Sequence, residues 1–245
     1  MPEGPSIIIL KEATIRFKGR KIIAAEGTTK KIDTPELVGE TITDIKTWGK
    51  HFLICLPKFT IRIHLLMFGT YRINEQKEAK PRLRLIFSNN EELSFYACAI
   101  VKIDEPLGEV YDWSSDVMNK KFDTRKAHKK LKTHPQTLVC DAILDQHIFS
   151  GAGNIFKNEV LFRTRIHPLS EIGSLTDAKR REVVKEVVRY GKDFLKWKKA
   201  FVLKKHWEVI GKKKCPRDGH KVIKAYLGKT RRRTFYCESC QKLYK

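Results

Sequence analysis

The stretch LDQHIFSGAGNIF, residues 144–156, contains a glycine-rich break between two segments with helical spacing. Residues 135–149 have a helical period and begin with a proline, which suits the first turn of a helix. The glycines interrupt this pattern, and residues 155–162 resume it. We therefore predict a helix, a glycine turn and a second helix that starts at Asn154.

Helical spacing continues on both sides of this break. Residues 120–132 form a basic segment with a helical period, and a capped helix is predicted from about Leu175, with Val184, Val187 and Val188 on one face. The sequence thus predicts an all-helical middle domain over residues 114–205.

The first hundred residues show a different pattern. Residues 5–18 are compatible with one amphipathic helix. Short strand-like runs separated by turn-forming segments follow it, at residues 21–25, 41–47, 51–56, 60–64, 70–73, 82–87 and 92–96. Short strands at such close spacing predict a β-sandwich or barrel, which we assign to a domain of residues 1–113.

The charge of the chain indicates its partner. In 245 residues there are 50 Lys and Arg against 28 Asp and Glu, a formal net charge of +22. So large an excess implies an extended acidic partner, and nucleic acid is the first candidate. A membrane surface is the alternative, but the sequence has no long apolar run and no signal-peptide pattern. We expect a soluble, intracellular protein that binds no membrane.

The end of the chain has the spacing of a metal site. Cys237 and Cys240 place two thiolates on a short turn, which is half of the tetrahedral shell of a zinc ion. Cys215 supplies a third ligand, and either Asp218 or His220 supplies the fourth. Because structural zinc takes imidazole more often than carboxylate, the predicted set is Cys215, His220, Cys237 and Cys240, in a domain of residues 206–245.

Residues 221–236, between the two halves of this site, are typical of a β-hairpin with Gly228 near its tip. Three consecutive arginines, Arg231, Arg232 and Arg233, lie on the returning strand. A hairpin held by zinc would present these guanidinium groups to phosphates, which their planar forks fit well.

Two other segments have the chemistry of a site. Without Met1, Pro2 is a free secondary amine, and because the reference pKa of an α-amino group is about 7.7–8.0, it can attack an aldehyde-like carbon at neutral pH. The carboxylate of Glu3 is one residue away. At Asn154, the backbone N–H groups of a helix start can hold a phosphate, and a simple N-cap role is compatible with the same position.

The order and spacing of five motifs resemble the formamidopyrimidine-DNA glycosylase and endonuclease VIII family of bifunctional DNA glycosylases, over nearly the whole chain. The motifs are Pro2-Glu3-Gly4-Pro5, Trp48-Gly49-Lys50-His51, His64-Leu65-Leu66-Met67-Phe68-Gly69, the stretch from Leu144 to Phe156, and Arg232-Arg233-Thr234-Phe235-Tyr236-Cys237. The resemblance implies an α+β protein with an N-terminal β-sandwich and flanking helices, a helix-two-turn-helix domain and a C-terminal zinc hairpin.

The resemblance also implies roles for particular residues. Pro2 matches the nucleophile that forms a Schiff base with the damaged sugar, and Glu3 matches the catalytic acid. Lys50, Asn154 and Arg232 match phosphate contacts, with Arg231 and Arg233 as alternatives to Arg232. The implied activity is base excision of oxidised bases followed by strand cleavage through β/δ-elimination at apurinic or apyrimidinic (AP) sites.

Leu66, Met67 and Phe68 match the loop that supplies wedge side chains in this family. A base must leave the duplex stack before it can be attacked, and apolar wedges fill the gap that it leaves. The alternative is that these residues belong to the core of a strand, but Gly69 ends the run as a tight turn would.

The sequence departs from the family at two positions. Ser6 stands where a second carboxylate is usual, and Asp218 aligns near the usual second cysteine of the zinc site. Because of the first departure, an alternative interpretation is a catalytically weakened relative that only recognises damaged or single-stranded DNA. A zinc-ribbon transcription or RNA-binding factor is a third possibility.

The length of one segment bears on the substrate. Residues 201–215 leave little room for the base-capping loop of purine-specific members, which favours endonuclease VIII and oxidised pyrimidines. Met67 favours oxidised purines such as 8-oxoguanine, because purine-specific members also carry methionine there. We expect a monomer that binds double-stranded DNA with damaged bases or abasic sites, in a bacterial-type cytoplasm at the nucleoid.

Overall fold

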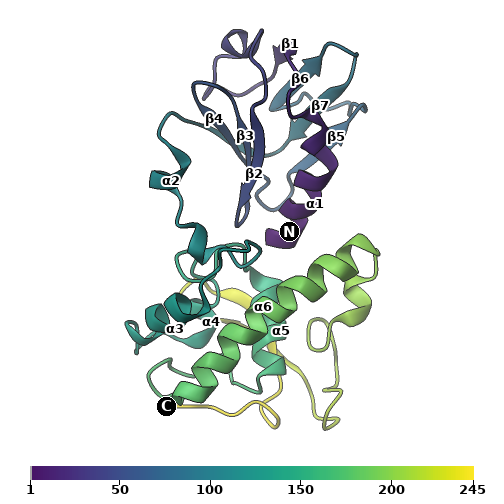
Figure 1. Cartoon of the computed structure of the whole chain (residues 1–245). Coiled ribbons are helices and arrows are strands. Elements are labelled where there is room, and N and C mark those ends of the chain that lie inside the picture. Colours follow the sequence, from purple (N-terminus) through teal and green to yellow (C-terminus); the bar gives the residue numbers. More distant parts are fainter. Residues whose placement is uncertain (1) are drawn as a thin grey trace. The chain divides into compact units, whose positions relative to one another are not determined.

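Two antiparallel four-stranded sheets form the N-terminal part of the protein in the computed structural model, which describes residues 2–245 (Figure 1). One sheet has the strand order β1 (Ile22–Glu26), β6 (Leu83–Phe87), β7 (Glu92–Tyr96) and β5 (Thr70–Ile73). The other has the order β2 (Asp44–Trp48), β3 (His51–Cys55), β4 (Thr60–His64) and β8 (Ala99–Ile103).

The two sheets bury one shared apolar core. Strand β6 shows the alternation that produces it, because Leu83, Leu85 and Phe87 are buried and the residues between them are not. From the other sheet, Phe52 meets Phe95 with ring centroids 5.7 Å apart. The expected β-sandwich is thus confirmed.

Helices flank the sandwich as expected. Helix α1 (Gly4–Thr14) continues into a 3₁₀ turn η1 (Ile15–Phe17) and buries Ile7 and Leu10 in the same core. Two short elements, η2 (Pro35–Leu37) and α2 (Leu107–Val110), complete this part.

Strand β8 was not predicted. Its two buried residues, Ile100 and Ile103, are three positions apart, so the sequence lacks the two-residue period of a half-buried strand. The strand is recognised only by its pairing with β4.

The C-terminal part is helical, apart from its last hairpin. It contains η3 (Trp113–Ser115), α3 (Thr124–Lys132), α4 (Val139–Ala142), α5 (Asn154–Arg163), α6 (Asp177–Lys199) and η4 (Leu203–His206). Side-chain caps set two of the starts: Asp123 accepts from the N–H groups of Arg125 and Lys126 before α3, and Thr176 accepts from Lys179 before α6.

The prediction of a continuous helix over residues 135–149 is wrong, because the structure contains only the short α4 there. Polar side chains satisfy the local backbone instead. Asp145 Oδ1 accepts from the His147 N–H at 2.8 Å, and Gln146 Nε2 donates to the Leu144 carbonyl at 2.7 Å. Such bonds compete with helical ones and favour turns.

Helix α5 lies at the centre of the second core. Phe156 is fully buried and meets Tyr190 of α6 edge to face at 5.3 Å and Phe194 at 5.8 Å. From the end of α5, the Arg163 guanidinium lies over Tyr190 and pairs with Glu208 at 2.8 Å. α5 is therefore covered on most sides. Because seven consecutive residues are buried, the sequence of this helix lacks the alternation of one apolar and one polar face.

The predicted hairpin is confirmed. Strands β9 (Ile223–Leu227) and β10 (Arg232–Tyr236) pair antiparallel, and Gly228 adopts φ +76° in the turn. By its internal packing the chain divides into two units, one of residues 6–111 with Pro2, the other of residues 112–245 with residues 3–5. The expected boundaries after residues 113 and 205 stay a prediction.

Replacing Phe156 tests the centre of the second core. We expect Phe156→Ala to lower the free energy of unfolding by about 3–5 kcal/mol, because it empties a fully enclosed site. Phe201→Ala is the matched control, since Phe201 is 95% exposed, and its effect should stay within about 0.5 kcal/mol. Denaturant unfolding measures both, and equal effects would contradict this description of the core.

Candidate functional site

The start of helix α5 is capped by a residue from the other end of the sequence. The carboxylate of Glu3 accepts from the N–H of Ile155 at 2.9 Å and from that of Phe156 at 3.4 Å, and Glu3 is fully buried. The residue at the N-cap position, Gly153, has no side chain to do this. The helix dipole adds to these bonds, because its N-terminal end favours a negative charge.

Gly153 is required for this contact. A Cβ atom at this position would lie 2.5 Å from Oε1 of Glu3, closer than any real contact. The backbone of the turn is also tied to the N-terminal segment, since the N–H of Gly4 donates to the Gly151 carbonyl at 2.9 Å. The glycine-rich turn thus makes room for the N-terminal segment of the chain.

The structure differs from the expectation that free N–H groups start this helix, because those of Ile155 and Phe156 are bonded to Glu3. The Asn154 side chain is also engaged: its Nδ2 donates to the Arg233 carbonyl at 3.0 Å. Its Oδ1 is buried and has no hydrogen-bond partner among the described residues. Asn154 therefore joins the helix start to the hairpin.

The arginine-bearing strand is held against α5. Asn158 uses both ends of its amide: Oδ1 accepts from the Phe235 N–H at 2.6 Å, and Nδ2 donates to the Arg233 carbonyl at 3.4 Å. At the hairpin tip, Asp141 accepts from the Lys229 N–H at 2.9 Å. The side chains of Arg231, Arg232 and Arg233 stay exposed, and the backbone of Arg233 is bonded to Asn154 at the helix end that Glu3 caps.

In the first unit, Lys50 lies at the turn between β2 and β3, after Gly49 with φ +53°. Beside it, His51 faces His64 across the β3–β4 pair, and His51 Nδ1 lies 3.2 Å from the Tyr111 hydroxyl. Burial, with smaller effects of nearby cations including Lys50, lowers the pKa of His51 to about 3 and also lowers that of His64. Both imidazoles are therefore neutral at pH 7.

This histidine pair is a feature that sequence reasoning missed. The available signal was the position of the two histidines in the sequence. His51 comes directly after Lys50, His64 comes directly before the loop of residues 65–69, and a hairpin would place these two strand ends opposite each other.

The three predicted wedge residues are exposed, which excludes the alternative of a strand core. Phe68 is 81% exposed, and Leu66 adopts a left-handed φ of +52°. Gly69 closes the turn by donating to the Leu65 carbonyl at 2.7 Å, where a Cβ atom would lie only 2.1 Å from that oxygen. This close approach explains the glycine.

Pro2 is half-buried and lies immediately before Glu3. Pro2 and Lys50 belong to the first unit, and Glu3, Asn154 and the three arginines belong to the second.

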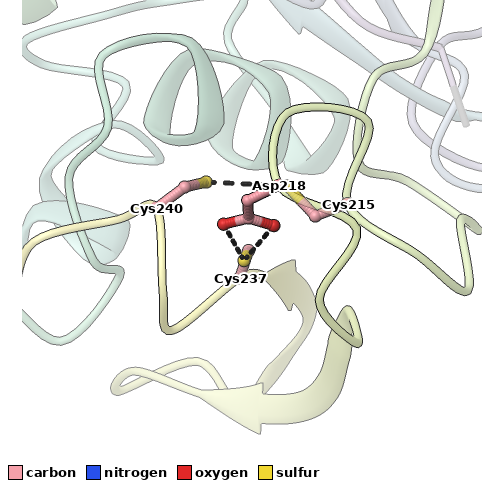
Figure 2. Close-up of side chains that lie close together, drawn as sticks. All are labelled: Cys215, Asp218, Cys237 and Cys240. Atoms are coloured by element: carbon pink, nitrogen blue, oxygen red, sulfur yellow. Dashed lines mark hydrogen bonds between the residues drawn. The ribbon is translucent and has the colours of Figure 1, made fainter.

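Four side chains at the C-terminal end form a group that could hold a metal ion (Figure 2). Cys215, Asp218, Cys237 and Cys240 place their ligand atoms within 4.8 Å of one another. The Cys215 and Cys240 sulfur atoms are 3.7 Å apart, and Cys237 Sγ lies 3.4 Å from an Asp218 oxygen. Hydrogen bonding, chiefly from Cys215, lowers the pKa of Asp218, so a carboxylate completes the group.

This grouping corrects the predicted ligand set, in which His220 was preferred to Asp218. The N–H of Gly219 donates to the Cys215 carbonyl at 2.9 Å and closes a turn in which Gly219 adopts φ +75°. Asp218 lies in this turn, and its carboxylate is close to the cysteine sulfur atoms. His220 falls outside the group found among residues 2–245; its carbonyl accepts from the Cys215 N–H, and its side chain is 65% exposed.

Comparison with known proteins identifies the class. A family model for the formamidopyrimidine-DNA glycosylase N-terminal domain matches residues 1–98, and one for the formamidopyrimidine-DNA glycosylase H2TH domain matches residues 114–202. The chain belongs to the formamidopyrimidine-DNA glycosylase and endonuclease VIII family.

Among curated relatives, endonuclease 8-like 2 of Bos taurus is 36% identical over 198 residues, which is 74% of this chain and 58% of that protein. Endonuclease 8-like 3 of Xenopus laevis is 30% identical over 222 residues, 86% of this chain and 36% of that protein. The chain therefore spans little more than half the length of the first relative and about a third of the second.

Among solved structures, a viral DNA glycosylase superposes with a TM-score of 0.86 at 21% identity, covering 98% of this chain and 100% of that one. Lactococcus lactis formamidopyrimidine-DNA glycosylase bound to DNA with an AP site superposes with a TM-score of 0.85 at 24% identity, over 98% and 99% of the two chains. At these identities the likeness shows a common fold.

The expected bacterial-type nucleoid location is not supported, because these curated relatives come from eukaryotes. Within residues 2–245, every helix is too short or too polar to cross a bilayer.

Adding a methyl group at residue 153 tests the contact between Glu3 and α5. We expect Gly153→Ala to displace the Glu3 carboxylate and to lower the free energy of unfolding by about 1–3 kcal/mol, because a partly buried and a buried N–H group lose their acceptor. Gly108→Ala is the control, since no atom lies within 4 Å of a Cβ there. Thermal unfolding measures both, and a Gly153→Ala protein as stable as the native one would contradict this role.

Proposed function

We propose that this protein is a base-excision-repair DNA glycosylase with AP lyase activity on oxidised bases. The observation that carries the proposal is the buried Glu3 carboxylate, held at the start of α5 directly after Pro2. Family membership supports the same activity, because the matching family models are those of a DNA glycosylase.

In the proposed reaction, the Pro2 nitrogen of a chain without Met1 attacks C1′ of the damaged nucleotide. The bond from C1′ to the base breaks, and the base leaves with the electron pair and a proton. The Pro2 nitrogen then gives up its proton, and its electron pair opens the sugar ring by breaking the bond from C1′ to O4′, which takes up a proton. The resulting iminium ion acidifies the C2′ proton, and removal of this proton expels the 3′ phosphate. These steps require a group that gives and takes protons near C1′.

Glu3 is the proposed group for these proton transfers. General acid–base catalysis depends first on geometry, and the N–H groups of Ile155 and Phe156 fix this carboxylate in place. Because Glu3 is covalently joined to Pro2, the cap of α5 also restrains the peptide that carries the nucleophile. Ser6 adds a hydroxyl rather than a second carboxylate, which supports a weakened, damage-binding relative as the alternative function.

Binding to double-stranded DNA would use groups from both units. Lys50 and Arg232 are proposed to contact phosphates, with Arg231 and Arg233 beside the latter, and Asn154 to complete the phosphate site. The exposed side chains of Leu66, Met67 and Phe68 suit a wedge that replaces the flipped nucleotide. A net charge of +22 supports an extended polyanionic partner of this kind.

We propose oxidised pyrimidines as the preferred lesions, because the segment of residues 201–215 is short and the relatives are named endonuclease 8-like proteins. Met67 supports oxidised purines as the alternative. Base release from duplexes with thymine glycol or 8-oxoguanine distinguishes the two.

We further propose that Cys215, Asp218, Cys237 and Cys240 hold a structural zinc ion. Three thiolates and one carboxylate make a four-ligand set of the charge and size that zinc accepts. The ion would contribute folding free energy to the hairpin end of the chain, where the apolar cluster around Phe162 and Val209 is small.

Variants of the two candidate fourth ligands test this assignment. We expect Asp218→Ala to lose most of its zinc on dialysis against a chelator, because one of four ligands is gone. His220→Ala, the matched control, should retain one zinc per chain, since its side chain lies outside the group. Metal analysis measures both, and zinc loss by His220→Ala with retention by Asp218→Ala would reverse the assignment.

Borohydride trapping tests the proposed activity. The protein without Met1, confirmed by mass, should form a covalent adduct with an abasic duplex, because borohydride reduces the iminium link to a stable amine. A variant with one further residue before Pro2 should form at least a hundredfold less, since the Pro2 nitrogen is then an amide. Absence of an adduct with the processed protein would overturn the enzyme proposal and leave the damage-binding alternative.

A further inference from the structure

Helix α5 and strand β10 are joined by polar contacts that converge on one backbone group. The Arg233 carbonyl accepts from Asn154 Nδ2 at 3.0 Å, from Lys157 Nζ at 3.3 Å and from Asn158 Nδ2 at 3.4 Å. These three donors lie at positions i, i+3 and i+4 of α5 and therefore on one helix face. The lysine is the unusual member of this set.

Lys157 is a buried cation with neutral partners. It is 1% exposed, and among the described residues its ammonium group has two hydrogen-bond acceptors, Thr234 Oγ1 at 2.7 Å and the Arg233 carbonyl. A buried charge is costly unless it is paired. Burial lowers the pKa of Lys157 to about 8, and the like charge of Arg232 acts in the same direction, whereas Asp141 and Glu3 act in the opposite one.

A chain of two hydrogen bonds leads from this ammonium group to Arg232. Lys157 Nζ donates to Thr234 Oγ1, which in turn donates to the Arg232 carbonyl at 2.9 Å. Thr234 is itself buried. Lys157 is thus bonded directly to the Arg233 carbonyl and through Thr234 to the Arg232 carbonyl, and the Arg232 side chain remains exposed.

We propose that Lys157 is a positioning residue for DNA binding: its buried ammonium group fixes the backbone of Arg232 and so holds that guanidinium in place for a DNA phosphate. This inference rests on the phosphate-binding role of Arg232 in the proposed function. It explains why a cation is kept in a buried position, where an apolar side chain of similar length would avoid the desolvation cost.

Lys157→Met tests the proposal, because methionine has a similar length and no donor. We expect its Kd for a duplex with an uncleavable abasic analogue to rise about tenfold, as expected for the loss of a charged hydrogen bond. Since the phosphate contact serves the ground state and the transition state alike, KM should rise with kcat nearly unchanged. Zinc content should stay at one ion per chain.

Lys179→Met is the matched control. Lys179 is also a partly buried helical lysine that donates to a backbone carbonyl, that of Thr164 at 3.0 Å, but it lies on α6, and neither this bond nor its ion pair with Glu182 involves the hairpin. Its Kd for the same duplex should change less than twofold.

A double-mutant cycle separates positioning from a general structural role. If Lys157 acts through Arg232, then adding Lys157→Met to Arg232→Ala should change Kd less than twofold beyond Arg232→Ala alone. If the two losses multiply, the proposal is overturned, and it is equally overturned if Lys157→Met binds like the native protein. Should Lys157→Met fail to fold, Thr234→Val takes its place in the cycle, because it removes the hydroxyl that connects Lys157 to the Arg232 carbonyl.

Failure of the positioning role can be distinguished from failure of the proposed function. Adduct formation by the native protein tests the chemistry of Pro2 alone, whereas the cycle measures binding to uncleavable DNA. An Arg232→Ala protein that binds this duplex as tightly as the native one would remove the premise and overturn the positioning role, whatever the trapping result.

Discussion

The contact on which the second unit depends is the bond between the Glu3 carboxylate and the first N–H groups of α5. It satisfies donors that the glycine turn cannot cap, and it places a buried carboxyl group at the helix end whose dipole favours negative charge. The same helix end holds the hairpin through Asn154. One helix start therefore brings together the Glu3 carboxylate, the Asn154 amide and the backbone of Arg233, which come from three distant parts of the sequence.

The hairpin has two anchors of different kinds. At its base, three cysteines and Asp218 form the group that suits a metal ion, and along its second strand the polar face of α5 holds the backbone through Lys157 and Asn158. The first anchor would depend on the proposed zinc ion, whereas the second consists of hydrogen bonds within the protein. The direction of the arginine-bearing strand is thus set by the helix, and the group of three cysteines and Asp218 lies at the base of the hairpin.

Much of the architecture could be predicted from the sequence, because alternation in strands such as β6 and the spacing of the cysteines are local signals. The failures share a cause in tertiary context. Residues 135–149 have a helical period, yet side-chain bonds from Asp145 and Gln146 stop the helix. Asp218 rather than His220 lies beside the cysteines because of a turn at Gly219. The general preference of zinc for imidazole over carboxylate gives no information about this turn. The pairing of His51 with His64 appears only once the strand register is known.

Gly153 and Glu3 are 150 residues apart in the sequence, but their close approach means that a change at one constrains the residue at the other during evolution. A side chain at residue 153 is compatible with the observed backbone only if residue 3 gives up its carboxylate, and a shorter residue 3 would leave the start of α5 uncapped. Neither position can change alone without loss, so homologous sequences should vary at both or at neither. Covariation between them would be a record of this contact in sequence data.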